Sequence, residues 1–194
     1  MVLHPTPSAV SSRILLSCHA VHPCQAVSAC EVAVAWKHHG LELAYRLDGF
    51  PGKLLVPSPA RHPGFADGLW QHTCLEAFIA LPDGERYREF NFSPSGNWAA
   101  YTFQTYRQRD TAWQPSVSPS LEWHSDTGLG VLRAGIPRKL LPAGSTLQLG
   151  LCAITEDLDG GTSYWALRHA GAKPDFHRRE DFCLTLTNLP DSAS

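Results

Sequence analysis

Trp70, His72 and Glu76 occupy even positions of the segment 69–81. The odd positions of its second half are apolar: Leu75, Ala77, Ile79 and Leu81. Because the side chains of a strand alternate between its two faces, an extended segment would bury these apolar residues and place an indole, an imidazole and a carboxylate on the opposite face. A pyranose stacks its C–H face on an aromatic ring and bonds its hydroxyls to polar side chains. The segment therefore predicts a saccharide-binding surface.

Two other segments carry side chains that suit the same surface. In the segment 86–92, one parity comprises Tyr87, Glu89 and Asn91, and the other includes Phe90 and Phe92. Trp165 and His169 share one parity near the segment 163–168, so they could add a second ring and imidazole. The alternative for Trp70 and Trp165 is burial in the core or at an edge, since tryptophan is highly buried on average. Both interpretations stay open at this stage.

The elements that must position these residues are strands. Apolar and polar residues alternate over 32–37 and 41–47 around His38-His39-Gly40, which predicts a β-hairpin. A loop rich in proline and glycine follows at 49–68, and its length suggests a functional role. Further strands are predicted at 69–81, 86–92, 97–107, 121–124, 130–136, 147–155, 163–168 and 182–187, with one helical turn at 137–141. The pattern favours an all-β antiparallel sandwich or barrel.

Length and composition restrict the class of protein. With 194 residues the chain suits one domain, predicted at 13–190 after a loose lead-in at 1–12. The net charge of −2 lacks the basic excess of a nucleic-acid-binding protein, and no apolar run approaches the about 20 residues that span a bilayer. The six cysteines form no CxxC pair, and the N-terminus lacks a signal-peptide pattern. We therefore expect a cytoplasmic protein with reduced thiols and neither nucleic-acid nor membrane partners.

Three groups of residues suggest a metal or cofactor. Cys18, Cys24 and Cys30 lie near two histidines but lack the paired spacing of structural zinc sites, so we favour a strand with incidental cysteines. The acidic, glycine-rich segment 156–161 could hold calcium, although a solvated hairpin turn is the better interpretation. His169 and His177 could ligate haem or a metal ion, but hydrogen bonding is preferred, with Asp175 fixing a tautomer. We expect no cofactor, with calcium and haem as alternatives.

Catalysis is the less favoured interpretation. Glu76 and Glu89 could form a glycosidase pair, which needs carboxyl groups about 5–9 Å apart. The favoured interpretation is that Glu76 and Glu89 accept hydrogen bonds from sugar hydroxyls or pair with arginine. The chain has no GxSxG elbow, Walker A motif or GxGxxG loop. Whether it is an enzyme stays open.

Three blocks carry a family resemblance. They are Gly68-Leu69-Trp70-Gln71-His72-Thr73-Cys74-Leu75-Glu76, Glu89-Phe90-Asn91-Phe92-Ser93-Pro94-Ser95-Gly96-Asn97-Trp98, and Tyr164-Trp165-Ala166-Leu167-Arg168-His169 with Pro174-Asp175-Phe176-His177. Together they resemble the bacterial DOMON-like proteins related to the family 9 carbohydrate-binding modules, over roughly residues 30–187. The resemblance implies a β-sandwich of jelly-roll type with a ligand site on one sheet face.

The same resemblance implies roles for individual residues. Trp70 and Trp165 match the two rings that hold a saccharide, and Glu76 matches the acidic strand position. Asn91, Arg107 and His169 are weaker matches. Other DOMON relatives bind haem b through pairs such as Met and His. The only methionine of this chain is the first residue, so a Met/His pair is excluded.

The sequence thus predicts non-catalytic binding of a small carbohydrate or sugar-like ligand. The predicted ligand-binding residues are Trp70, His72, Glu76, Asn91, Arg107, Trp165 and His169. The alternatives are a haem-binding or redox module with histidine ligands, a hydrolase built on Glu76 and Glu89, and a scaffold that binds another protein.

Overall fold

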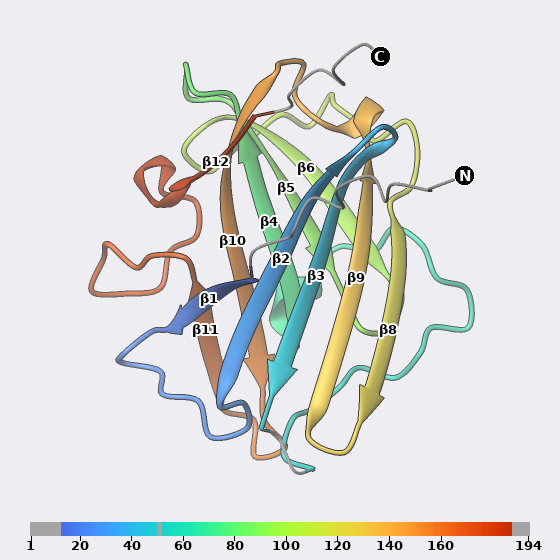
Figure 1. Cartoon of the computed structure of the whole chain (residues 1–194), viewed down its shortest axis with the longest axis vertical. Helices are drawn as coiled ribbons and strands as arrows, with labels where there is room; N and C mark the ends of the chain where they lie inside the picture. The colour runs from blue at the N-terminus through green and yellow to red at the C-terminus, as the bar shows by residue number, and fades with distance from the viewer. Residues whose placement is uncertain (1–12, 50–51, 188–194) are drawn as a thin grey trace, which may run out of the picture.

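Two sheets packed face to face form the described part of the chain. The computed structural model describes residues 13–49 and 52–187, and within these residues all paired strands run antiparallel. The front sheet in Figure 1 contains β2 (Ala29–Lys37), β3 (Gly40–Asp48), β9 (Leu129–Pro137) and β8 (Ser120–Asp126), in that order. The predicted all-β antiparallel sandwich is therefore confirmed.

The rear sheet is larger. Its order is β11 (Thr162–Ala166), β10 (Thr146–Glu156), β4 (Cys74–Ala80), β5 (Tyr87–Phe92), β6 (Trp98–Thr105) and β7 (Gln108–Arg109). β10 is long enough to pair with two strands along one edge, namely β11 and β12 (Leu184–Thr187). Its other edge pairs with β4.

β1 (Arg13–Cys18) connects the two sheets. Residues 13–16 pair with β2 of the front sheet, and Ser17 and Cys18 pair with β11 of the rear sheet (Figure 1). Backbone hydrogen bonding therefore continues from one sheet into the other along this side. The opposite side is bounded by β7 and β8, the two ends of the strand order.

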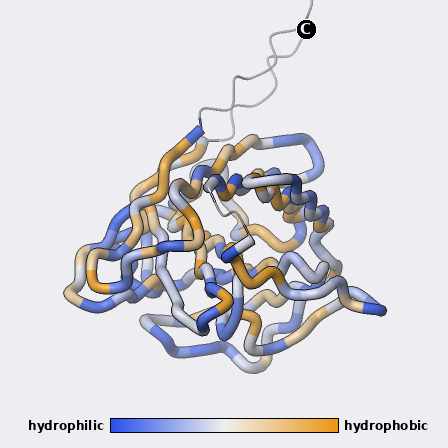
Figure 2. The backbone as a smooth tube through the Cα atoms, turned by 90° about the horizontal axis from the view of Figure 1, so that it is seen from below, coloured by the Kyte–Doolittle hydropathy of each residue, from blue (hydrophilic) through white to orange (hydrophobic). Residues whose placement is uncertain are grey.

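The main core lies between the sheets. It takes the odd positions of β4 and the even positions of β5, as the alternation predicts, together with the inward side chains of the front sheet. Figure 2, a view from one end, shows the hydropathy changing repeatedly along the backbone. A buried hydrogen bond ties the layers together, because the Tyr45 hydroxyl of β3 donates to the backbone carbonyl of Glu76 in β4 at 2.6 Å.

The outer face of the rear sheet is buried as well. A second apolar cluster lies there, made of Phe78, Ala80, Tyr87, Ala99, Tyr101, Phe103, Cys152, Ala166 and Phe182. It is covered by the segment 167–183, which contains the short helix η3 (Arg179–Asp181). The helix η1 (Leu69–Gln71) packs nearby through Leu69. β4 is consequently buried on both faces.

Several predicted elements appear with small changes. The hairpin predicted over 32–47 is β2 and β3, and its turn uses Gly40 at φ 151, where a Cβ atom would lie 2.0 Å from the Ile136 carbonyl oxygen. The helical turn predicted at 137–141 is η2 (Arg138–Leu140). The predicted lead-in at 1–12 lies outside the described residues.

The strand predicted from residue 69 begins only at Cys74. Gly68 adopts a left-handed conformation at φ 76 and starts η1, in which the backbone N–H of His72 bonds to the carbonyl of Leu69. A helical turn removes the alternation that a strand imposes, so the parity argument for Trp70 and His72 does not apply to them.

Candidate functional site

Two buried carboxylates and an amide form the floor of the candidate site. Glu76 of β4 lies opposite Asn91 of β5 in the register, and Glu89 lies two residues away on the same face. Asn91 donates its side-chain amide to Glu89 Oε1 at 2.8 Å. All three side chains are almost fully buried. We call Glu76, Glu89 and Asn91 the acid floor.

Burial disfavours the charged forms of the two carboxyl groups in the acid floor. Burial, followed by repulsion from Glu89, raises the pKa of Glu76 well above its ordinary value. Burial also raises the pKa of Glu89 to about 7, although the Asn91 hydrogen bond and the charges of Arg107 and Arg109 oppose this shift. Near neutral pH the pair therefore retains protons that exposed glutamates would have lost.

Two acceptor atoms of the floor lack a partner. Within the described residues, Glu76 Oε1 and Asn91 Oδ1 are buried and accept no hydrogen bond. A buried acceptor without a donor costs about 1–3 kcal/mol. Atoms of this kind are uncommon in folded proteins, and they indicate a place where a donor from outside the chain would be stabilised.

One end of the floor is closed by His177. Its Nε2 lies 3.6 Å from Glu89 Oε2, and its Nδ1 lies 2.8 Å from the Tyr87 hydroxyl. That hydroxyl accepts the backbone N–H of Arg107 and so is free to donate to Nδ1, which leaves the imidazole proton on Nε2, facing Glu89. Burial, reinforced by the charge of Arg107, lowers the pKa of His177 to about 4 although Asp175 opposes this. The ring is therefore neutral at pH 7.

The β6 side of the floor is aromatic, because Tyr101 lies opposite Glu89 in the register. The Tyr101 hydroxyl donates to Asp67, and the Arg109 guanidinium lies 4.0 Å above the Tyr101 ring. Trp70, carried by η1, meets the edge of Tyr101 at 6.1 Å between ring centres. Because 42% of Trp70 is exposed, this indole offers a free surface beside Tyr101, the residue that pairs with Glu89.

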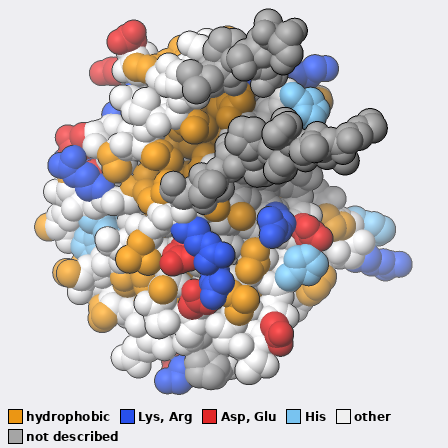
Figure 3. Space-filling model, in the orientation of Figure 1, with side chains coloured by type: hydrophobic (Ala, Val, Ile, Leu, Met, Phe, Trp, Pro, Cys, Tyr) orange, Lys and Arg blue, Asp and Glu red, His pale blue; other side chains and the backbone are white. Residues whose placement is uncertain are grey.

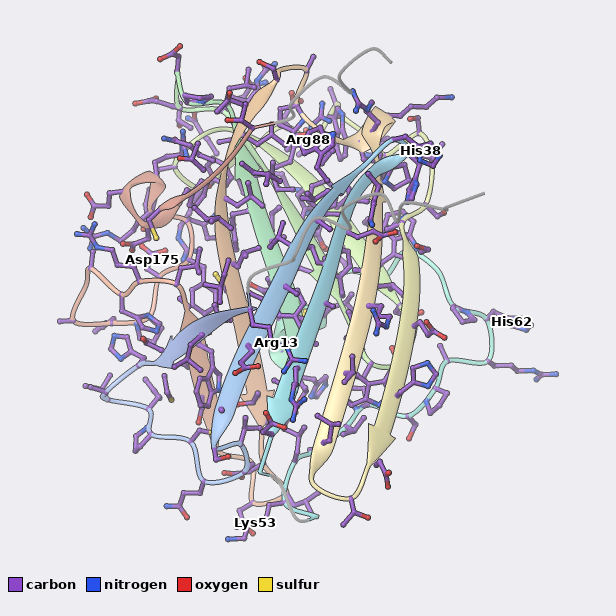
Figure 4. All side chains as sticks on the ribbon, in the orientation of Figure 1. Arg13, His38, Lys53, His62, Arg88 and Asp175 are labelled. Atoms are coloured by element: carbon purple, nitrogen blue, oxygen red, sulfur yellow. The ribbon has the colours of Figure 1, made fainter. Side chains whose placement is uncertain are left out.

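The structure brings only some of the predicted residues together. Glu76 and Asn91 are adjacent, and Trp70 lies near them through η1 rather than through strand parity. His72 is mostly exposed, and its Nδ1 lies 2.8 Å from Glu156 Oε2. Arg107 occupies the turn after β6 at φ 55 and forms a 2.9 Å ion pair with Asp175, a residue labelled in Figure 4.

Trp165 does not share this face, and His169 belongs to the segment 167–183 that covers it, where it contacts Phe176. Trp165 pairs with Ala153 and points into the core between the sheets, where its Nε1 donates to the Thr155 hydroxyl at 3.1 Å. The outward positions of β11 belong to its even-numbered neighbours, so the predicted second stacking ring is absent from the acid floor. His169 follows β11, and its Nε2 lies 2.9 Å from the carbonyl oxygen of Ser17 in β1.

The segments suggested as metal sites are used differently. Among the described residues, no group of three or more His, Cys, Asp or Glu side chains is arranged to hold a metal ion. The Asp157 carboxylate accepts the backbone N–H groups of Asp159 and Gly161 and so stabilises its own turn. His19 accepts the backbone N–H of Val21 and lies 3.3 Å from the Gly171 carbonyl, so both ring nitrogens have backbone partners.

Some residues near the floor are not among the predicted ligand-binding residues. The sequence favours hydrogen bonding for His177, with haem or metal ligation as the alternative, and it favours hydrogen bonds to sugar hydroxyls or pairing with arginine for Glu89. It predicts no role for Asp67, Tyr101 or Arg109. Within β6, however, Tyr101 shares its parity with Ala99 and Phe103, opposite Trp98 and Ala100. Apolar or aromatic residues therefore occur at both odd and even positions of β6. This pattern in the sequence indicates a strand that is covered on both faces.

The outer face of the front sheet differs from the acid floor. It has a hollow of about 490 Å³, lined by small side chains such as Ala33, Ala44 and Gly135 and bordered by Lys37 and Arg133. Figure 3 shows that this face carries side chains of both charges among hydrophobic ones. Its charged residues lie in solvent, so they carry no desolvation cost comparable to that of Glu76.

Comparison with known proteins supports the fold. No family model matches the chain, and no curated protein matches its sequence. Among solved structures, a protein from Bacteroides uniformis described as a "putative carbohydrate-binding protein" is similar, with a TM-score of 0.67. The match covers 91% of this chain and 86% of that one, at 16% sequence identity. At this identity the similarity establishes the shared all-β architecture.

One further finding concerns membranes. Within residues 13–49 and 52–187, no helix has the length and apolar character needed to cross a bilayer.

Proposed function

We propose that this protein binds a small carbohydrate non-covalently on the outer face of its rear sheet, between Trp70 and the acid floor. The observation that carries the proposal is the pair of unpartnered, buried acceptors, Glu76 Oε1 and Asn91 Oδ1. Sugar hydroxyls supply the donors that these atoms need, and the C–H face of a pyranose suits the exposed indole. Trp165 has no part in it.

Two other observations support carbohydrate as the ligand class. The solved structure with a similar fold belongs to a protein that is itself described as a "putative carbohydrate-binding protein". The blocks around Trp70 and Asn91 resemble DOMON-like proteins related to family 9 modules, and membership of that family is part of the proposal, as is a cytoplasmic location. Arg107 lies beside Tyr87 and His177, close enough to the floor to act at its rim.

Ligand entry requires a small rearrangement. The polar atoms of the floor are buried under side chains of the neighbouring segments, among which Leu69 and Trp70 belong to η1. Leu69 and Trp70 are only partly buried, and η1 is a single helical turn after Gly68. A shift of this turn would expose Glu76 and Asn91 without disturbing the sheet, because the neighbouring strands hold both residues.

The test is calorimetric titration with mono- and disaccharides. We expect saturable binding to the wild type, and an affinity about 5-fold lower in Trp70→Ala, since stacking on an aromatic ring contributes roughly 1 kcal/mol. Trp123→Phe is the matched control, because it removes an indole from β8 of the front sheet and should leave binding unchanged. Absence of binding across the panel by folded wild-type protein, or equal binding by Trp70→Ala, would contradict the proposal.

Glycoside hydrolysis is a second candidate because of the acid pair. A general acid needs a raised pKa, and that of Glu89 is raised to about 7. The two carboxylates lie on neighbouring strands of the same face. Release of a chromophore from an aryl glycoside, abolished in Glu89→Gln, would favour this function over binding alone. A Soret band in the purified protein would instead favour the haem alternative.

A further inference from the structure

The acid floor contains many acceptors and few donors. Ionised glutamates only accept hydrogen bonds, and the amide oxygen of Asn91 is a further acceptor. The amide N–H of Asn91 serves Glu89 Oε1, and the Cys74 thiol, a weak donor, hydrogen-bonds to Glu76. The imidazole N–H of His177 reaches Glu89 only at 3.6 Å. The missing groups are therefore donors.

The floor also lacks a cation of its own. In the described ranges, no lysine or arginine forms an ion pair with Glu76 or Glu89, and the His177 ring that lies 3.6 Å from Glu89 is neutral. Arg107 and Arg109 act on Glu89 from a distance, and each is paired elsewhere. Arg107 bonds to Asp175 at 2.9 Å, and Arg109 lies 3.8 Å from Asp67. Neither guanidinium neutralises the floor directly.

A single ligand could supply both the hydrogen-bond donors and the positive charge that the acid floor lacks. Two buried carboxylates on one face repel each other, and each carries a desolvation cost. Protonation of a carboxyl reduces the repulsion and supplies one O–H donor, but it adds no positive charge and no more than one donor for the acceptors Glu76 Oε1 and Asn91 Oδ1. A neutral hydroxyl group supplies one donor and no charge. A primary ammonium group supplies three donors, accepts nothing and carries the positive charge that an unpaired acid pair stabilises.

We therefore propose that the preferred ligand is an amino sugar, whose primary ammonium group contacts Glu76, Glu89 and Asn91 while its ring lies against Trp70. This inference rests on the proposed carbohydrate binding and specifies its ligand. It distinguishes the site from one built for neutral glucose-like sugars, in which the acceptors of the floor would have to be balanced by donors from the chain.

The inference includes a pH dependence. Affinity for the ammonium ligand rises from pH 5 to 7 as Glu89 begins to ionise, because its pKa is raised to about 7 and a protonated carboxyl offers no negative charge. The titratable or charged groups that face the floor from the surrounding elements are Cys74, Cys152, Tyr87, Tyr101, Asp67, Arg107, Arg109, Asp175 and His177. Burial raises the pKa of both thiols and both phenols, and that of His177 is lowered to about 4. Among these groups and the two glutamates, Glu89 is the one whose pKa, about 7, lies at this window.

The experiment compares four probes by calorimetry at pH 7. Glucosamine carries the ring and the charge, N-acetylglucosamine and glucose carry the ring alone, and cyclohexylamine carries the charge alone. We expect glucosamine to bind at least 10-fold more tightly than the other three. Glu76→Gln should reduce this preference to less than about threefold, because the glutamine keeps the shape and loses the charge. Glu122→Gln, which removes an exposed carboxylate from β8, should leave it unchanged.

The outcomes separate this inference from the proposed function. Glucose or N-acetylglucosamine binding as tightly as glucosamine would overturn ammonium recognition and leave carbohydrate binding intact. Cyclohexylamine binding as tightly as glucosamine would overturn the sugar component. Binding of none of the probes would overturn both. If Glu76→Gln fails to fold, Glu89→Gln and the wild-type pH profile provide the same test, and an affinity for glucosamine that stays flat from pH 5 to 7 refutes the inference.

Discussion

Replacing Glu89 by glutamine should change how the stability of the protein depends on pH. Glu89 is buried beside Glu76, and its pKa is raised to about 7 from an ordinary value of 4.5. An acid with a raised pKa in the folded state favours folding while it is protonated. Its contribution is fully present below pH 4.5 and is lost as the pH rises through 7, because only the unfolded chain ionises freely over that interval.

The magnitude follows from the difference between the two pKa values. At about 1.4 kcal/mol per pKa unit, an increase from 4.5 to about 7 corresponds to roughly 3 kcal/mol of unfolding free energy. The wild type should therefore lose about 3 kcal/mol relative to Glu89→Gln between pH 4 and pH 8. Glutamine keeps an oxygen that can accept the Asn91 amide, so this hydrogen bond can persist in the variant.

The assay is urea denaturation followed by tryptophan fluorescence at several pH values from 4 to 8. The quantity of interest is the difference between wild type and variant, since titrating groups that do not interact with Glu89 affect both proteins equally, whereas Glu76, which Glu89 repels, belongs to the effect measured. Glu122→Gln, an exposed carboxylate on the front sheet, is the control and should give a difference near zero throughout. Parallel stability profiles for the wild type and Glu89→Gln would refute the argument that burial controls this carboxylate.

Three further predictions concern the core and the thiols. Trp165→Ala should lower the free energy of unfolding by about 3–5 kcal/mol in urea denaturation, because the indole fills the interior between the sheets; a loss below 1 kcal/mol would place it at the surface. Tyr45→Phe should cost about 1–3 kcal/mol in the same assay, since the Glu76 carbonyl loses a buried donor, and an unchanged midpoint would contradict that hydrogen bond. Native protein treated with a maleimide and analysed by mass spectrometry should label at Cys183, the exposed thiol. Labelling at the buried thiols Cys30, Cys74 and Cys152 should require denaturant, and rapid native labelling there would contradict their burial.

Alternation within a single strand was readable from the sequence. The hairpin around Gly40 has the predicted position, and in β5 the residues Tyr87, Glu89 and Asn91 share the outer face as expected. These features depend only on the geometry of one extended segment and on a turn that requires glycine. Neighbouring strands then brought Glu76 next to Asn91, because a two-strand hairpin fixes its own register.

The sequence did not reveal which distant strands pair with one another or which face of each strand lies inside the sandwich. Parity shows which residues of a strand share a face, whereas strand pairing decides which face is inside. Here both faces of the rear sheet are buried, and large aromatic residues lie on each, such as Phe78 on the outer face and Trp165 on the inner face. An apolar side chain therefore does not reveal which of the two faces it occupies. The alternation of a strand does not apply to Trp70, because this residue lies in the helical turn that follows Gly68. The burial of Glu76 under neighbouring segments depends on contacts far apart in the sequence.

β1 joins the two sheets along one side of the sandwich. Because this strand pairs with β2 through its first residues and with β11 through its last, backbone hydrogen bonds connect the sheets on that side. The opposite side of the sandwich is formed by the edge strands β7, which is only two residues long, and β8, which is mostly exposed. On that side the segment 110–119 connects β7 to β8, and its Trp113 and Val117 pack against the core, so side chains rather than backbone hydrogen bonds hold the sheets together there. Amide protons of β8 should exchange with deuterated water long before those of residues 14–18.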